Sequence, residues 1–278
     1  MSETSWDLSG FGDEIDADPR IQAAVMRALG ASYIEVRSAW GTNVVDLSED
    51  QLAELKAILD EAGLKTSAIA SPIGKVDVSL PVEHEVERLG RALRAAGVLG
   101  AGYIRIFSFY YEGKTPEEAR EPVIERMTAL AKRSEGTGVV LVHENEKGIY
   151  GDIPVRVLDI VESVDSPALK LAWDNANFVQ VGVKPFTEAF ELLRPHTVYV
   201  QVKDALAASG TVVPSGEGDG ELLATVEGFR DSGYSGFVSL EPHLADAFEL
   251  GGFSGPYAFG VAARAFAKVL EAAGVEAG

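Results

Sequence analysis

The sequence contains no cysteine and only four histidines among its 278 residues. The absence of cysteine excludes disulfide bonds, thiolate metal sites and a cysteine nucleophile. No apolar run approaches the roughly 18 consecutive residues of a membrane-spanning helix. The first residues, MSETSWDLSGFG, do not combine a basic region with an apolar one, as a signal peptide would. We therefore expect a cytoplasmic protein that does not associate with membranes.

Basic residues are also scarce, with 24 Lys and Arg against 43 Asp and Glu, which gives a formal net charge of −19. Binding to a phosphate backbone depends on clusters of Lys and Arg, so this balance argues against a nucleic-acid partner. The simplest role of the excess charge is solubility. A glycine-rich phosphate loop is missing after the first expected strand, which argues against a nucleotide-binding fold.

What the sequence does contain is a regular alternation of strand and helix patterns with no linker between them. Eight helical patterns follow eight apolar strand patterns, which lie at 6–15, 33–37, 64–71, 103–110, 139–146, 169–174, 197–204 and 236–243. Strands that alternate with helices favour a parallel sheet, and eight such units close most economically into a barrel. The sequence therefore predicts a single α/β domain over residues 1–278, a (β/α)₈ TIM barrel.

Each of the last four strands ends on an oxygen-bearing side chain. The run VVLVHENE (139–146) leads to Glu144, and the next three strands lead to Asp174, Gln201 and Glu241, at steps of 30, 27 and 40 residues. In a barrel these side chains would share one rim, where three carboxylates need either protons or a cation. Oxygen ligands favour Mg²⁺ or Mn²⁺ over Zn²⁺. The alternative is that each residue only ends a strand and meets water.

Three basic side chains lie next to these strand ends. Lys203 follows the strand-end glutamine by two residues, so it shares its face and could hold a substrate oxygen or carboxylate. A surface lysine is the alternative. His243 shares the strand parity of the last glutamate and is expected to orient substrate, whereas His143 has the opposite parity and should face the helices.

Other candidates lie in loops near the same rim. Trp40 follows the second strand and could cover a small polyol, or it could pack on the core. Glu217 lies in the glycine-flanked loop PSGEGDGE, which is flexible enough to form a lid. Glu14 is a further candidate for substrate contact. For Glu35 and Arg37, a structural ion pair between strands is the better expectation.

Taken together, the segments GFGDEI, YIEVR, HENE, WDNAN, QVKD, PSGEGDGE and SLEPH resemble the xylose-isomerase-like TIM barrel superfamily, the sugar phosphate isomerase/epimerase family. The resemblance extends over nearly the whole chain. It implies one metal ion held by Glu144, Asp174, Gln201 and Glu241, of which the two glutamates are the catalytic acid/base pair. The family often has histidine at the third ligand position, where this chain has Gln201. It often has a substrate-binding histidine three residues after the aspartate, where this chain has Asn177.

The resemblance implies a divalent-metal-dependent isomerase or epimerase of a sugar, sugar acid or cyclitol, with Mn²⁺ or Mg²⁺ as cofactor. Such an enzyme abstracts a proton next to a metal-bound carbonyl. A lyase that dehydrates a keto-cyclitol or 3-dehydroshikimate would use the same groups. The apurinic endonuclease branch is a histidine-rich, multi-metal version of the barrel that four histidines do not fit. A non-catalytic sugar-binding or partner subunit remains open. The expected partner is a small sugar or polyol, and a homo-oligomer is possible.

Overall fold

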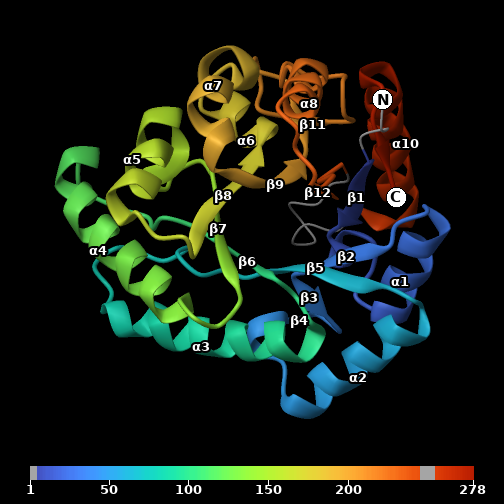
Figure 1. Cartoon of the computed structure of the whole chain (residues 1–278), viewed down its shortest axis with the longest axis horizontal. Coiled ribbons are helices and arrows are strands. Elements are labelled where there is room, and N and C mark those ends of the chain that lie inside the picture. The colour runs from blue at the N-terminus through green and yellow to red at the C-terminus, as the bar shows by residue number, and fades with distance from the viewer. Residues whose placement is uncertain (1–4, 245–253) are drawn as a thin grey trace.

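The computed structural model describes residues 5–244 and 254–278 of the chain. Eight parallel strands alternate with helices along it (Figure 1): β1 (Ser5–Gly10), β2 (Tyr33–Val36), β5 (Lys65–Ala70), β6 (Tyr103–Ile106), β7 (Val140–Glu144), β8 (Leu169–Asp174), β9 (Thr197–Val202) and β12 (Phe237–Leu240). Their order in the sheet is β1-β12-β9-β8-β7-β6-β5-β2, and β13 (Glu276–Ala277) pairs with the start of β1 on its other side. A parallel bridge between Phe11 and Glu35 joins β1 to β2. The sheet thus curls round on itself, and the predicted TIM barrel is confirmed.

The helices lie outside the curled sheet (Figure 1): α1 (Pro19–Ala28), α2 (Glu49–Glu61), α3 (Val82–Leu99), α4 (Pro116–Ser134), α5 (Pro154–Val164), α6 (Asn175–Gln180), α7 (Phe190–Leu193), α8 (Leu222–Asp231) and α10 (Gly255–Ala273). Local sequence sets several helix starts. The side chain of Asp18 caps α1, and Ser48 and Thr115 form capping boxes with the residues three positions later. Among the described residues, no helix is long and apolar enough to cross a membrane.

Short elements connect the main ones, and one strand is shorter than expected. They are η1 (Gly12–Glu14), β3 (Ser38–Ala39), β4 (Thr42–Asn43), η2 (Val44–Asp46), η3 (Tyr150–Asp152), η4 (Pro185–Ala189), η5 (Arg194–His196), β10 (Asp204–Ala205) and β11 (Val212–Val213). The fourth strand was expected to reach residue 110, but β6 ends at Ile106. The backbone N–H groups of Phe107 and Phe109 instead donate to carbonyls of the preceding βα loop.

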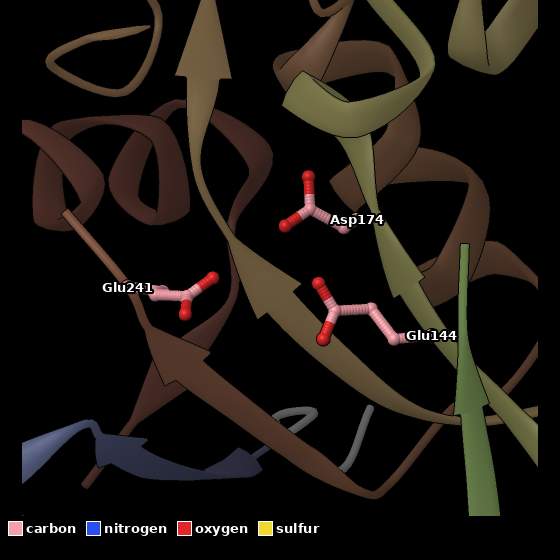
Figure 2. A group of neighbouring side chains, drawn as sticks. All are labelled: Glu144, Asp174 and Glu241. Carbon is pink, nitrogen blue, oxygen red and sulfur yellow. The ribbon is translucent and has the colours of Figure 1, made fainter. Parts of the chain in front are cut away.

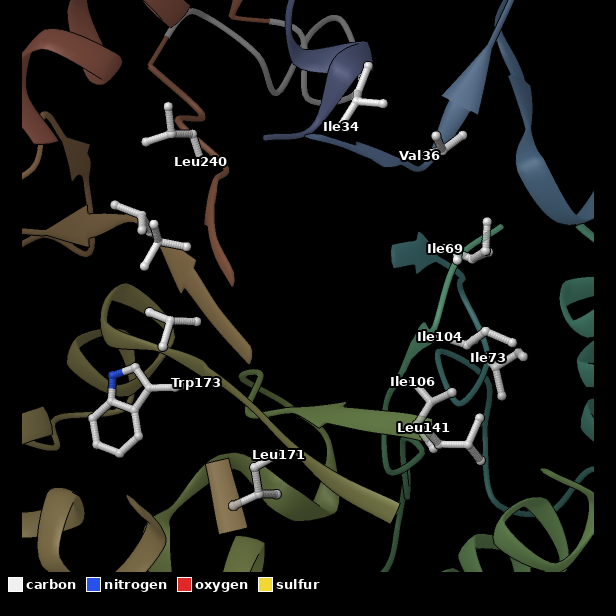
Figure 3. Close-up of a cluster of buried hydrophobic side chains, with 14 of the residues drawn as sticks. Ile34, Val36, Ile69, Ile73, Ile104, Ile106, Leu141, Leu171, Trp173 and Leu240 are labelled. Atoms are coloured by element: carbon white, nitrogen blue, oxygen red, sulfur yellow. The ribbon is translucent and has the colours of Figure 1, made fainter. Parts of the chain in front are cut away.

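The residues of each strand face the helices and the barrel interior in turn. The outward set is apolar and buried and forms much of the core (Figure 3): Ile34, Val36, Ile69, Ile104, Ile106, Leu141, Leu171, Trp173 and Leu240. The intervening residues face the barrel axis, because strand side chains alternate between faces. A separate apolar cluster that includes Ala68, Val142 and Tyr199 fills this interior. The same alternation directs the strand-end carboxylates inward.

Candidate functional site

Three carboxylates converge at the carboxyl ends of the strands (Figure 2). Glu144 ends β7, Asp174 ends β8, and Glu241 directly follows β12. One oxygen from each lies within 4.8 Å of the others, and all three side chains are buried. Residues that are 97 positions apart along the chain thus meet in one acidic triad, as the sequence predicted.

Gln201 lies beside the acidic triad. It is paired in register with Asp174 on β8 and with Ser239 on β12. One end of its amide lies 2.8 and 3.0 Å from the two carboxylate oxygens of Glu144, and the other end lies 3.4 Å from Oε1 of Glu35. With its oxygen toward Glu144, the amide places a fourth oxygen against the triad.

Three cations already contact the triad. The Nζ atom of Lys203 lies 2.9 Å from Oε2 of Glu241 and 3.1 Å from Oδ2 of Asp174. Nη1 of Arg105 lies 3.1 Å from Oε2 of Glu144 and 3.7 Å from Oε1 of Glu241. Lys203 is therefore no surface lysine. Its ammonium is buried between two strand-end carboxylates.

Arg37 is the third cation, and it links the triad to the first βα loop. Its guanidinium reaches Glu241 at 2.9 Å, Glu14 at 2.7 Å and Asp13 at 2.8 Å. Arg37 thus forms the expected structural ion pair between strands, whereas Glu35 forms no ion pair among the described residues. Arg37 follows β2 and extends across the rim, while the side chain of Glu35 is held deeper in the barrel by Tyr199.

Aromatic rings hold the two guanidinium groups in place. The guanidinium of Arg105 lies 4.7 Å from the ring centroid of Phe107 and 5.2 Å from that of Phe11, which directly follows β1. The guanidinium of Arg37 lies 4.9 Å from the same Phe11 centroid. Cations over ring faces are attracted by the ring quadrupole, more strongly when they are shielded from water. Sequence reasoning missed Arg105. The available signal was a charged residue at an inward position of the strand YIRI.

The charges in this cluster do not balance. The ion pairs join three cations, Arg37, Arg105 and Lys203, to five carboxyl groups, those of Asp13, Glu14, Glu144, Asp174 and Glu241. If every group were ionised, the buried cluster would carry two excess negative charges. Two bound protons or one divalent cation would remove them.

In the metal-free chain, protons take up part of this excess. Burial raises the pKa of Glu144 to about 8, because its effect outweighs the opposing effect of Arg105. Burial also raises the pKa of Asp174 to about 6. Burial also acts to raise the pKa of Glu241, but Lys203 and the neighbouring arginines hold it well below its usual range. Burial thus favours the protonated form of Glu144, and the neighbouring cations favour the ionised form of Glu241.

The donor set suits a divalent cation with a preference for oxygen. Three buried carboxylates lie within 4.8 Å of one another, and the amide of Gln201 lies beside Glu144. Carboxylate and amide oxygens are the ligands that Mg²⁺ and Mn²⁺ prefer.

Two further candidates lie at the edge of the triad. Nδ1 of His243 is 3.4 Å from Oε1 of Glu14, and its Nε2 is 3.9 Å from Oε1 of Glu241. His243 is not on the strand, because β12 ends at Leu240 and His243 has a left-handed φ of 47°. The backbone turn, rather than strand parity, brings its ring to the site. Burial raises the pKa of Glu14 to about 7.

Asn177 connects two members of the triad instead of facing open space. Its Nδ2 donates to Oε1 of Glu144 at 2.8 Å and to the carbonyl of Asn145 at 2.9 Å. Its backbone N–H donates to Oδ1 of Asp174, which thereby caps α6, a short helix that the sequence did not predict. Its substrate-binding role stays a prediction, and its visible role is to position Glu144.

The structure does not bring Trp40 or Glu217 to the triad through any contact between described residues. Trp40 has a φ of 52° and packs, half-buried, against the hydrophobic core. Glu217 is exposed, in a loop whose Gly216, Gly218 and Gly220 N–H groups donate to the carboxylate of Asp204. That anchoring holds the loop in place. His143 faces away from the interior, against Gly151, as its parity predicted.

Comparison with known proteins identifies the barrel. Residues 23–258 match the family described as xylose isomerase-like TIM barrel. The chain belongs to this family. It is 28% identical over 232 residues to a 2-epi-5-epi-valiolone 7-phosphate 2-epimerase from an Actinoplanes species, over 82% of this chain and 81% of that protein. The predicted family is confirmed, and the predicted isomerase/epimerase class agrees with this relative.

Solved structures of low sequence identity share the fold. The IOLI protein with a binding zinc atom is 17% identical, with a TM-score of 0.77 and coverage of 96% of this chain and 98% of that one. The probable 3-DHS dehydratase AsbF from Bacillus anthracis is 19% identical, with a TM-score of 0.73 and the same two coverages. At these identities the likeness concerns the architecture of this xylose isomerase-like barrel.

Proposed function

We propose that this chain is a divalent-metal-dependent isomerase or epimerase of a sugar, sugar acid or cyclitol. One observation carries the proposal: the buried strand-end carboxylates of Glu144, Asp174 and Glu241 converge to within 4.8 Å of one another. The pKa of Glu144 is raised to about 8, and that of Glu241 is held well below its usual range. Carboxyl groups whose environments separate their pKa values are suited to act as acid and base. The epimerase from Actinoplanes supports the reaction class.

The proposed metal ligands are Glu144, Asp174, Gln201 and Glu241, and their oxygen donors favour Mn²⁺ or Mg²⁺. A divalent ion bound there would polarise a substrate carbonyl and acidify the neighbouring C–H bond. The zinc atom in the IOLI structure is consistent with a metal in this kind of barrel. The identity of the metal in this chain is part of the proposal.

Glu241 and Glu144 each carry out one of the two proton transfers. Glu241 takes the proton from the carbon next to the carbonyl, and Glu144 supplies a proton from the other side. Delivery of the proton from Glu144 to the opposite face of the same carbon inverts that carbon. Delivery of a proton to the former carbonyl carbon, with transfer of the adjacent hydroxyl proton to the former carbonyl oxygen, isomerises the substrate. Lys203 keeps Glu241 ionised, while His243 and Glu14 lie at the edge, where they can bind substrate hydroxyls.

The test is a substrate screen of the protein loaded with Mn²⁺ in D₂O. The panel holds ketoses, keto acids, inosose and 2-epi-5-epi-valiolone 7-phosphate, and NMR follows each carbon-bound hydrogen. An epimerase should place deuterium at the inverted carbon. Failure to bind metal, together with no exchange in any substrate, would contradict the proposal and favour a non-catalytic subunit.

A dehydratase of a keto-cyclitol or 3-dehydroshikimate is the second candidate. It is favoured by the three cations around the triad, which suit an anionic substrate, and by the fold shared with the probable 3-DHS dehydratase. The first proton abstraction is the same, but water is then lost. The same screen distinguishes this reaction, because its unsaturated product adds ultraviolet absorbance.

A further inference from the structure

Glu35 is a buried carboxylate for which the proposed reaction has no use. It lies on β2 beside a register shift, with 0% of its surface exposed. Its Oε2 accepts hydrogen bonds from the hydroxyl of Tyr199 at 2.8 Å and from Ser239 at 2.6 Å. No ion pair among the described residues involves it. A buried carboxylate without a cation is costly unless hydrogen bonds satisfy it.

The second oxygen of Glu35 has a different neighbour. Its Oε1 lies 3.4 Å from Nε2 of Gln201, on the side of the amide opposite to Glu144. Gln201 therefore lies between two carboxyl groups, and each end of its amide faces one of them. The amide has two orientations, which present either its oxygen or its nitrogen to the acidic triad.

The two orientations have opposite consequences for the triad. When Nε2 donates to Glu35, Oε1 faces Glu144 and adds an oxygen donor to the three carboxylates. When the amide is turned, Nε2 donates to both oxygens of Glu144, at 2.8 and 3.0 Å, and this arrangement satisfies the amide better as long as no cation binds. Only the first arrangement offers a cation four oxygen ligands.

We propose that Glu35 is the positioning residue that directs the oxygen of Gln201 toward the acidic triad. Because Tyr199 and Ser239 both donate to Oε2, the orientation of the carboxylate is fixed and Oε1 remains an acceptor for the amide N–H. Partners behind a metal ligand commonly fix its orientation in this way. The inference rests on the proposed divalent-cation site.

Glu35→Gln is the decisive variant because it preserves the shape of the side chain. Tyr199 and Ser239 would still donate to the amide oxygen of the new residue, which places its nitrogen where Oε1 of Glu35 was. That nitrogen faces Gln201, so the amide of Gln201 should turn and present its own nitrogen to Glu144. We expect the dissociation constant for Mn²⁺, measured by calorimetry, to rise about 10-fold or more, the scale reported for such supporting partners.

A double-mutant cycle separates this role from a general effect on folding. In a Gln201→Ala background there is no amide to orient, so Glu35→Gln should leave Mn²⁺ binding within about twofold. Ser67→Ala is the matched control, since it removes a hydroxyl that bonds to Tyr199 rather than to Glu35, and it should leave Mn²⁺ binding within about twofold. The same loss of affinity in both backgrounds, or no loss in either, would overturn the inference.

A neutron structure of the protein with Mn²⁺ bound supplies a readout that does not depend on affinity. Deuterium on the amide of Gln201 should point to Glu35 in the natural chain and to Glu144 in Glu35→Gln. Deuterium directed at Glu144 in the natural chain would overturn the inference. A natural chain that binds no Mn²⁺ would defeat the proposed function, whereas Mn²⁺ affinity that Glu35→Gln leaves unchanged would overturn the inference alone.

Discussion

The ammonium of Lys203 lies 3.1 Å from Oδ2 of Asp174, in a buried ion pair. The same ammonium donates a bond of 2.9 Å to Glu241. Lys203 thus supplies positive charge to two oxygens that we propose as metal ligands. A lysine and a divalent ion that share these oxygens oppose each other's binding through charge repulsion.

Lys203→Met should therefore have opposite effects with and without metal. Removing one partner of a buried ion pair costs about 3–5 kcal/mol, so we expect thermal stability in EDTA to fall. Saturating Mn²⁺ should raise the Tm of the variant more than that of the natural chain, because the competing cation is gone. Thermal unfolding with EDTA and with Mn²⁺ measures both effects.

The control is Lys56→Met, which removes an exposed ion pair with Asp60 one helical turn away. Such pairs are worth roughly 0.3–0.5 kcal/mol, so both Tm values should stay near those of the natural chain. A smaller Mn²⁺ shift in Lys203→Met than in the natural chain would mean that Lys203 supports metal binding.

Gln201→His should retain metal binding and move the preference toward Zn²⁺ or Co²⁺. Imidazole is a softer ligand than an amide oxygen and suits these metals better. Competition between Mn²⁺ and Zn²⁺ for the two proteins provides the measurement. If the ratio of the two affinities does not change, Gln201 is not a ligand.

His143 should weaken the fold in acid. Its ring is fully buried on the side of β7 that faces the helices, and neither nitrogen has a hydrogen-bond partner among the described residues. Burial lowers its pKa to about 3, against about 6.5 in an unfolded chain. Below about pH 6.5 the unfolded chain therefore binds a proton that the folded chain rejects, and stability falls as the pH approaches 3.

His143→Leu removes this proton uptake without removing apolar volume. At pH 7 we expect the variant to be at least as stable as the natural chain, because two unsatisfied nitrogens are lost. Between pH 7 and 4 it should lose less stability, by on the order of 3 kcal/mol. Urea unfolding at both pH values measures the difference. Equal losses in the two proteins would contradict the assignment.

The sequence predicted the acidic triad because two regular periods determine it. The βα repeat brings the strand ends to one rim, and the two-residue strand period directs Glu144 and Asp174 inward. Contacts across the barrel have no such period. Arg37 was expected to form an ion pair between strands, but no sequence period identifies its partners, Glu14 and Glu241, which come from other βα units.

Side chains beyond the strand ends were harder to predict for the same reason. His243 reaches the site through a left-handed backbone turn, which strand parity does not describe. Arg105 was overlooked although its strand position is inward, because its significance depends on Phe11 and Phe107, which approach from different loops. Trp40 and Glu217 lie in irregular segments whose direction no sequence period fixes.

The roles of the two glutamates can be separated by proton exchange. If Glu241 is the base, Glu241→Gln should reduce turnover by about 10²-fold or more. It should also abolish exchange of the substrate C–H hydrogen with D₂O, because the first proton transfer is lost. Glu144→Gln should reduce turnover as strongly but retain exchange, because Glu241 can still remove the proton and return a deuteron to the same face.

Glu146→Gln is the matched control, because this carboxylate follows the same strand but pairs with Lys75 outside the triad. Its turnover should remain close to that of the natural chain. Metal content of each variant must be measured, since the glutamine oxygen can still bind the ion. Turnover near the natural level in Glu241→Gln, with metal bound, would disprove its role as base. Loss of exchange in Glu144→Gln alone would reverse the two assignments.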